Sequence, residues 1–174
     1  MIDVRGLYKS FEDKTVLSDI NASFENGKTN LIIGQSGSGK TVLMKCIVGL
    51  LTPEKGEVLY DGRNLVLMGK KEKKMLRKEM GMIFQSAALF DSMSVLDNVM
   101  FPLNMFSNDT LRDRTKRAMF CLERVNLTEA KDKFPGEISG GMQKRVAIAR
   151  AIALNPQYLF CDEPNSGLDP KTSL

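Results

Sequence analysis

The sequence predicts an α/β fold that contains a parallel sheet. Three short apolar segments have the length and composition of buried strands: residues 28–34, 81–85 and 156–164. Helical segments separate them along the chain, and strands that alternate with helices are typical of a parallel sheet covered by helices. A chain of 174 residues is long enough for a substantial core, so we expect residues 1–174 to form a single domain.

The N-terminal part is expected to add an antiparallel β subdomain. Residues 2–11 and 15–24 are extended in character, a polar turn separates them, and apolar residues alternate along the second segment as in a half-buried strand. A further strand-like run is followed by Asp61-Gly62, a pair typical of tight hairpin turns.

Three further segments are expected to be helical. Residues 40–51 are apolar nearly all round, as in a helix that lies inside the protein. Apolar residues recur at helical spacing in residues 86–134, and another helix starts at Gly140. The predicted organisation is a core of residues 1–85 and 135–174, with residues 86–134 inserted as a helical subdomain.

The composition is that of an ordinary globular domain. Apolar residues make up 43% and charged residues 26% of the chain. No apolar run reaches the ~18 residues of a membrane span, and the N-terminus lacks the features of a signal peptide, so we expect a cytoplasmic protein. Cys46, Cys121 and Cys161 show no metal-ligand spacing, and we expect them to be buried thiols in a reducing compartment.

The net charge of +4 is concentrated in one segment. Residues 70–79 hold six basic and two acidic side chains, which accounts for the whole excess. A short basic helix is most often a solvated surface, and contact with membrane headgroups is the weaker alternative. Because the rest of the chain is balanced, the spread-out positive surface of a nucleic-acid-binding protein is absent, and we expect no nucleic-acid partner.

Residues 34–41, GQSGSGKT, match the phosphate-binding pattern G-x-x-x-x-G-K-[ST] between a predicted strand and a predicted helix. The glycines let backbone N–H groups point at phosphate oxygens, and the helix start adds a partial positive charge. Lys40 would place a full charge at the β- and γ-phosphates, and the Thr41 hydroxyl would bind Mg²⁺. A chance match by a Gly/Ser-rich turn is the alternative, and the flanking elements disfavour it. The residues expected to contact ATP here are Gly34, Gln35, Ser36, Gly37, Ser38, Gly39, Lys40, Thr41 and Val42.

Acidic side chains follow the last predicted strand. Asp162 and Glu163 stand at its carboxyl end, where ligands bind in open α/β sheets. Asp162 would hold Mg²⁺ or its waters, and Glu163 would act as the base for the attacking water. Gln85 ends the strand of residues 81–85 and should reach the same edge, where its amide can contact Mg²⁺ or water. Taken alone, an Asp-Glu-Pro turn is usually solvated, but the P-loop favours the functional interpretation. We therefore expect Lys40, Gln85 and Glu163 to be catalytic, and Thr41, Gln85 and Asp162 to be the metal ligands.

A second helix start suited to an anion lies at Ser139, Gly140 and Gly141. The serine can cap the helix, and the glycines let a ligand approach the backbone. One nucleotide cannot rest on both helix starts of one chain if they approach the γ-phosphate from opposite sides. The simplest arrangement is a head-to-tail homodimer in which these three residues contact the ATP of the partner.

The order of these motifs resembles that of ABC-type ATPases. The match comprises the P-loop, Gln85, ISGGMQKR at residues 138–145, the Asp-Glu pair and SGLD at residues 166–169. The resemblance implies a P-loop NTPase (RecA-like) core in which Phe11 stacks on adenine and Val16 touches the same ring. It also implies that the SGLD segment lies at the dimer seam and links the two sites.

A narrower resemblance concerns residues 84–103, FQSAALFDSMSVLDNVMFPL, which together with Met142 are similar to Mla/Mce-type ATPases of lipid transport. Those ATPases work in pairs with a permease to move phospholipid between bacterial membranes. The resemblance implies that the helical subdomain docks on a membrane permease near Gln85 to Phe106, on the cytoplasmic face of the bacterial inner membrane. Docking surface and core packing are equally good interpretations of the apolar residues 87–90.

Two features depart from the family pattern. Met142 replaces a polar residue, although the preceding Ser-Gly-Gly is intact. The family also has a histidine after the strand that follows SGLD, whereas this chain has no histidine and ends at Leu174. We therefore expect that the C-terminal part of the fold is missing, that a sheet edge is exposed, and that hydrolysis belongs to the complete protein.

The function expected is that of an ATP-binding subunit of an ABC transporter, which hydrolyses ATP in a head-to-tail dimer to power lipid transport, with phospholipid as the favoured cargo. Two alternatives stay open. A soluble ABC-type ATPase that acts on nucleic acid or the ribosome usually carries two cassettes or long insertions, and neither is seen here. An inactive nucleotide-binding module is the other alternative, and a turnover assay would identify it.

Overall fold

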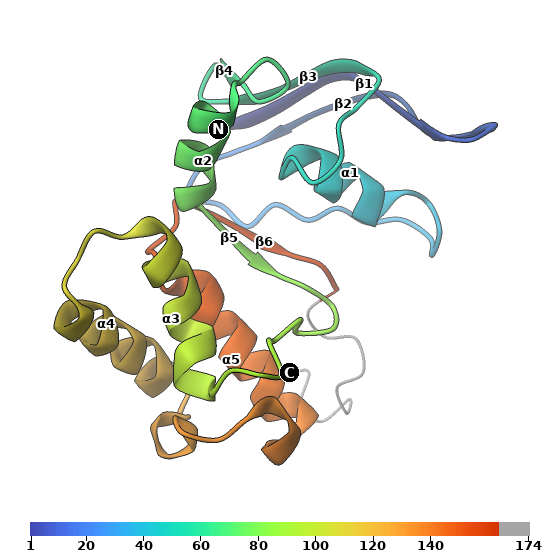
Figure 1. The fold of residues 1–174 in the computed structure, drawn as a ribbon. Coiled ribbons are helices and arrows are strands. Elements are labelled where there is room, and N and C mark those ends of the chain that lie inside the picture. Colours follow the sequence, from blue (N-terminus) through green and yellow to red (C-terminus); the bar gives the residue numbers. More distant parts are fainter. Residues whose placement is uncertain (164–174) are drawn as a thin grey trace. The chain divides into compact units, whose positions relative to one another are not determined.

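The computed structural model describes residues 1–163, which belong to two compact units (Figure 1). The N-terminal unit comprises residues 1–74, and the C-terminal unit begins at Met75. Helix α2 (Lys70–Lys78) runs across the boundary between them and confirms the helix expected in the basic segment. None of the helices in the described residues is long and apolar enough to cross a membrane.

The N-terminal unit contains a four-stranded sheet in the order β2-β1-β3-β4, in which every neighbouring pair is antiparallel. Its strands are β1 (Ile2–Phe11), β2 (Lys14–Phe24), β3 (Lys55–Tyr60) and β4 (Arg63–Asn64). This confirms the antiparallel β subdomain. Asp61 and Gly62 connect β3 to β4 with φ of 47° and 82°, the conformation of the two-residue hairpin turn that Asp-Gly predicts.

Helix α1 (Lys40–Ile47) follows the P-loop, and its side chains Leu43, Met44, Cys46 and Ile47 are buried, as expected for a helix apolar nearly all round. The Tyr60 hydroxyl at the end of β3 donates to the Ile47 carbonyl over 2.9 Å, which ties the end of α1 to the sheet. The helix ends four residues earlier than predicted, because Gly49 has a φ of 73°.

The strand predicted for residues 28–34 is wrong. These residues have no regular secondary structure, and Leu31 and Ile33 are 79% and 84% exposed. An apolar run becomes a sheet strand only where neighbouring strands complete its hydrogen bonds, and no strand of the described residues pairs with this one. The apolar pattern indicates that the segment is suited to burial, but it does not specify which strand would pair with it.

The C-terminal unit contains a two-stranded parallel sheet, β5 (Met80–Ile83) and β6 (Tyr158–Cys161), in which Ile83 lies opposite Cys161. Both strands were expected, and so was their parallel direction. The burial expected for β6 is wrong beyond Tyr158, since Leu159 is 49% exposed and Cys161 is exposed as well. A pair of strands has two open edges, so the side chains near its end lack the neighbours that a wider sheet provides.

Three longer helices pack around one apolar core in the C-terminal unit: α3 (Val95–Phe106), α4 (Leu111–Arg124) and α5 (Gly140–Ile152). Short 3₁₀ turns at Thr128–Ala130 and Pro135–Glu137 connect α4 to α5. The helices predicted within residues 86–134 and at Gly140 are therefore present.

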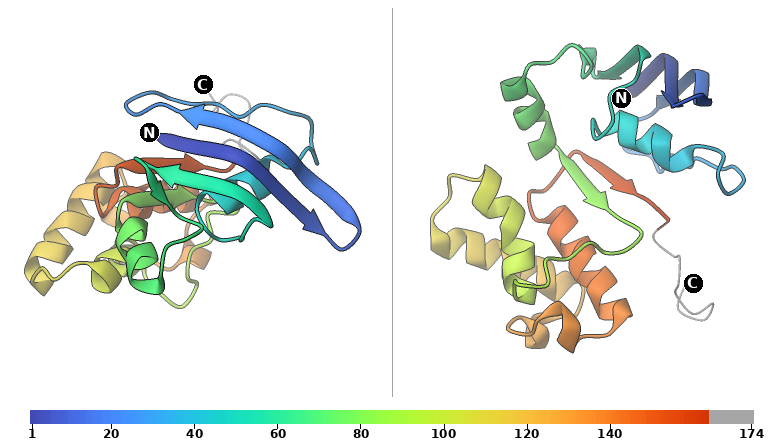
Figure 2. Two further views of the ribbon diagram at one scale, coloured as in Figure 1. Left: turned by 90° about the horizontal axis from the view of Figure 1, so that it is seen from above. Right: turned by 45° about the vertical axis from the view of Figure 1, so that its right-hand side comes forward.

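Helix α5 also lies against the parallel sheet (Figure 2). The close approach depends on Gly81 of β5, because a Cβ there would lie 2.4 Å from the Ala151 carbonyl oxygen. The lack of a side chain at Gly81 thereby allows the last turn of α5 to pack directly against the strand that leads to Gln85.

Candidate functional site

The P-loop leads into α1 with two glycines in the left-handed region, Gly37 at φ 77° and Gly39 at φ 93°. L side chains rarely adopt this conformation. A Cβ on Gly39 would also lie 3.1 Å from side-chain carbons of Val16 and Leu17, so both backbone and packing require glycine. The structure thus places Val16 of β2 against the P-loop.

The Lys40 side chain folds back over the P-loop. Its Nζ donates to the carbonyls of Gly34 and Gln35 over 2.9 and 3.0 Å. The ammonium group therefore lies beside the loop where phosphate oxygens would sit, and a phosphate could replace the two carbonyls as its acceptor. Thr41 and Val42 follow in the first turn of α1 and are partly buried.

Phe11 closes β1 in the same unit. Phe11 is 44% exposed, and the Lys9 ammonium lies 5.3 Å from the centroid of its ring. An exposed aromatic side chain suits stacking on a base, and in this structure the Phe11 ring contacts Lys9 of the same strand.

In the C-terminal unit the structure brings Gln85 and Glu163 together. Gln85 lies two residues after β5 and Glu163 two residues after β6, and the Gln85 Nε2 donates to the Glu163 Oε2 over 3.2 Å. The Asp162 N–H donates to the Ile83 carbonyl over 2.9 Å, so strand pairing continues up to this edge. An amide and a carboxylate thus meet in solvent at the carboxyl ends of two parallel strands, where ligands bind in such sheets.

Helix α5 begins at the predicted second anion site. The Ser139 Oγ caps the helix by accepting from the Met142 N–H over 3.2 Å. Gly140 and Gly141 are exposed, and neither has a positive φ. Apart from the adjoining residues and the backbone of the helix itself, no described atom lies within 4 Å of a Cβ built on either. Met142, the departure from the family pattern, packs against the helical core, so its apolar side chain has a structural reason.

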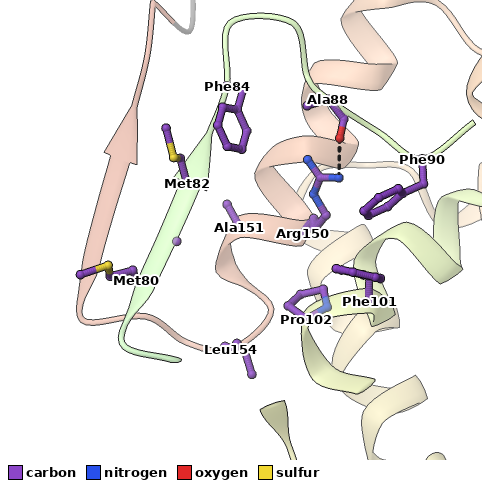
Figure 3. Close-up of a pocket in the computed structure, with 11 residues that line it drawn as sticks. Met80, Met82, Phe84, Ala88, Phe90, Phe101, Pro102, Arg150, Ala151 and Leu154 are labelled. Atoms are coloured by element: carbon purple, nitrogen blue, oxygen red, sulfur yellow. Dashed lines mark hydrogen bonds between the residues drawn. The ribbon is translucent and has the colours of Figure 1, made fainter. Parts of the chain in front are cut away.

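Sequence reasoning missed two side chains that hold the segment after Gln85. Arg150 is the single charged residue in the apolar stretch 146–154. This position among apolar residues was the sequence feature that could have marked it as a buried, hydrogen-bonded side chain. Asn98 is fully buried on the apolar side of α3. Arg150 also lines an apolar pocket of about 270 Å³, together with Met82, Phe90 and Phe101 (Figure 3).

The predicted site residues are divided between the two units. Phe11, Val16 and residues 34–42 belong to the N-terminal unit, whereas Gln85, Ser139, Asp162 and their neighbours belong to the C-terminal unit. The SGLD motif, residues 166–169, lies outside the described residues.

Comparisons with known proteins show the family. The model of the family described as ABC transporter matches residues 17–166. The chain is 43% identical over 169 residues to the "Probable ribonucleotide transport ATP-binding protein mkl" of Mycobacterium leprae, covering 97% of this chain and 49% of that protein. It is 41% identical to the methionine import ATP-binding protein MetN of Legionella pneumophila (99% and 50% covered). It is also 41% identical to the intermembrane phospholipid transport system ATP-binding protein MlaF of Haemophilus influenzae (98% and 64% covered).

Solved structures show the same fold. The "Dimeric Structure of MJ0796, a Bacterial ABC Transporter Cassette" matches with a TM-score of 0.91 and 32% identity, over 99% of this chain and 78% of that one. A post-hydrolysis dimer of the same cassette, bound to ADP and Pi, matches with a TM-score of 0.89. The chain spans about half the length of the first of these curated relatives. On its sequence and its fold, the chain belongs to the ABC transporter family.

Proposed function

We propose that the chain is the ATP-binding subunit of an ABC transporter, that two copies face head to tail, and that each closes the nucleotide of the other. Residues 1–174 act as one ATPase domain, with residues 86–134 as its helical subdomain. ATP lies on the P-loop, with Phe11 and Val16 at the adenine and Lys40 at the β- and γ-phosphates.

The observation that carries the dimer is the start of α5. Glycine is unfavourable by about 1 kcal/mol relative to alanine in the interior of a helix, which is an upper limit for glycines in the first turn. Neither Gly140 nor Gly141 needs its conformational freedom, and the described part of the chain leaves room for a side chain at both. The lack of side chains at these two positions therefore suits the close approach of a group that does not belong to the described part of this chain. The N–H groups of a helix start capped by Ser139 suit an anion such as the partner's γ-phosphate.

Thr41 in the first turn of α1 and the residues at the edge of the parallel sheet would have separate roles in hydrolysis. A hydroxyl, an amide oxygen and a carboxylate, from Thr41, Gln85 and Asp162, are the oxygen ligands that Mg²⁺ prefers, and the ion would neutralise charge on the phosphates. Glu163 accepts a proton from the attacking water, and the Gln85 amide, 3.2 Å from the Glu163 carboxylate, orients that carboxylate and the water.

Gly141→Ala tests the composite dimer. The change should raise the free energy of unfolding by up to about 1 kcal/mol, because alanine favours the helix and the added methyl group has space. It should nevertheless weaken ATP-dependent dimerisation at least tenfold, because the methyl group blocks the approach of phosphate. Chemical denaturation and sedimentation with ATP measure the two effects on the complete natural protein.

The matched control is Gly136→Ala in the 3₁₀ turn, where an added Cβ also meets nothing within 4 Å. This variant should dimerise like the wild type. Unchanged ATP-dependent dimerisation of Gly141→Ala would remove the assignment of this helix start to the partner's nucleotide.

For the transported substrate we propose a phospholipid, moved by a permease that docks near Gln85 to Phe106 on the cytoplasmic face of the bacterial inner membrane. The resemblance of residues 84–103 and the likeness to MlaF of H. influenzae support this choice. Within residues 87–90, Ala87 is buried whereas Ala88 and Phe90 are exposed, so this segment offers side chains both to the core and to a partner.

The choice of substrate can be tested on the transporter purified with its permease in lipid nanodiscs. ATP turnover should depend on the phospholipid composition of the nanodiscs and stay unchanged on addition of methionine or ribonucleotides. If methionine or a ribonucleotide stimulates ATP turnover at constant lipid composition, the proposed substrate is wrong. The substrate would then belong to the class named for the relative concerned.

A further inference from the structure

The segment that follows Gln85 has an unusual backbone conformation. Ala87 and Ala88 both lie in the left-handed region, with φ of 57° and 47°. Alanine rarely adopts this conformation because its Cβ crowds the backbone, and two such residues in succession require an external constraint. The Ala87 N–H donates to the Phe84 carbonyl over 3.1 Å and the Ala88 N–H to the Ser86 carbonyl over 2.6 Å, so the bend is tight.

Arg150, in the last turn of α5, supplies that constraint. Its Nη1 donates to the Ala88 carbonyl over 2.8 Å (Figure 3). Its Nη2 donates to the Ala87 carbonyl, also over 2.8 Å. The guanidinium carbon also lies 6.0 Å from the ring centroid of Phe90. Burial lowers the pKa of Arg150 because it disfavours the charged form, and no carboxylate of the described residues pairs with the side chain. The two carbonyls are therefore the acceptors that stabilise this cation.

A second side chain holds the far end of the same segment. Asn98 of α3 is fully buried. Its Oδ1 accepts from the Phe90 N–H over 2.8 Å, and its Nδ2 donates to the carbonyls of Phe90, Met93 and Ser94 over 3.0 to 3.1 Å. The backbone is thus fixed at Ala87 and Ala88 by one helix and at Phe90 to Ser94 by another.

Only three residues, Phe84 to Ser86, lie between this fixed part and the last residue of β5. Strand pairing holds the other end, since the Ile83 carbonyl accepts from the Asp162 N–H. Gln85 sits in the middle of this short span and reaches Glu163 over 3.2 Å. The positions of Ala87 and Ala88 therefore limit the positions that the Gln85 amide can take.

We propose that Arg150 is a positioning residue for Gln85: by holding the left-handed bend at Ala87 and Ala88, it keeps the Gln85 amide at Glu163. The inference rests on the proposed function, in which Gln85 and Glu163 serve hydrolysis. Arg150 acts only through the backbone of the segment after Gln85, and it does so from the same helix that begins at Ser139.

Arg150→Lys tests the inference in the complete ATPase. Lysine keeps the charge but presents one nitrogen in place of the guanidinium fork, so it cannot hold both carbonyls in the same geometry. We expect kcat to fall at least tenfold while the Kd for ATP changes less than twofold. Hydrogen exchange of a peptide covering residues 84–92 should accelerate, and this readout does not depend on activity.

Arg117→Lys is the matched control. Arg117 of α4 makes a similar pair of bonds, from Nε to the Ala153 carbonyl over 2.8 Å and from Nη2 to the Ile152 carbonyl over 2.9 Å, and lies 5.3 Å from the Phe120 ring. It holds the end of α5 without contacting the segment after Gln85. The control variant should lose stability but keep kcat within twofold of the wild type.

A double variant decides whether Arg150 acts through Gln85. In a Gln85→Ala background, Arg150→Lys should lower kcat less than twofold further. An equal loss with and without Gln85, or an unchanged kcat for Arg150→Lys alone, overturns the inference. If Arg150→Lys does not fold, Arg150→Gln takes its place in these measurements. If neither variant folds while Arg117→Lys does, the role of Arg150 is purely structural, and this result also overturns the inference. Unchanged turnover of Gln85→Ala alone would instead contradict the proposed function, while the exchange measurement still shows whether Arg150 holds the bend.

Discussion

Glu163→Gln is expected to lower steady-state ATP turnover at least a hundredfold and to leave ATP binding intact. The substitution keeps the size and hydrogen-bonding capacity of the side chain but removes the carboxylate that would accept a proton from water, and general-base catalysis typically contributes about 10²–10⁴-fold. Because the variant still binds ATP but hydrolyses it slowly, the ATP-bound dimer should accumulate. Turnover and sedimentation of the complete protein with Mg²⁺ and ATP measure the two effects.

The control for this variant is Glu129→Gln, which removes an exposed carboxylate from a 3₁₀ turn of the same unit. It should turn over ATP at the rate of the wild type. A Glu163→Gln protein that hydrolyses ATP at an unchanged rate would show that another group activates the water, and the contact with Gln85 would then be structural.

Lys40→Ala is expected to weaken ATP binding on the order of a hundredfold. Hydrogen bonds to charged groups contribute about 1.5–3 kcal/mol, and the Lys40 ammonium would donate to more than one phosphate oxygen. The carbonyls of Gly34 and Gln35 that lose this donor belong to exposed residues and can bind water instead, so stability should change little. Calorimetric titration with ATP gives the affinity.

Lys45→Ala provides the comparison, because Lys45 lies in the last turn of the same helix, away from the P-loop. Its affinity for ATP should match that of the wild type. Equal affinities for all three proteins would mean that the P-loop does not hold the phosphates.

Elements set by local chemistry could be predicted from the sequence. The Asp61-Gly62 turn forms because both residues tolerate a positive φ, and Ser139 caps α5 because its hydroxyl accepts a backbone N–H. The contact of Gln85 with Glu163 follows from two parallel strands that end at the same edge. In each case the cause lies within a few residues or in strand direction alone.

Features that depend on distant partners could not be predicted. Residues 28–34 have the composition of a buried strand, yet they form none, because composition does not specify a pairing partner. The left-handed alanines at 87 and 88 contradict local preference, and their carbonyls accept hydrogen bonds from Arg150, which lies 63 and 62 residues later in the chain. The exposure of Cys161 likewise reflects which neighbours complete the sheet around it.

This uneven burial of the thiols makes the protein suited to selective chemical labelling. Cys46 and Cys121 are buried, Cys161 is exposed, and the sequence has no other cysteine. Partial desolvation raises the pKa of the Cys161 thiol, so mildly alkaline buffer favours its reaction with a maleimide. A fluorophore attached there would stand two residues from Glu163, and could follow events at the sheet edge without an engineered cysteine.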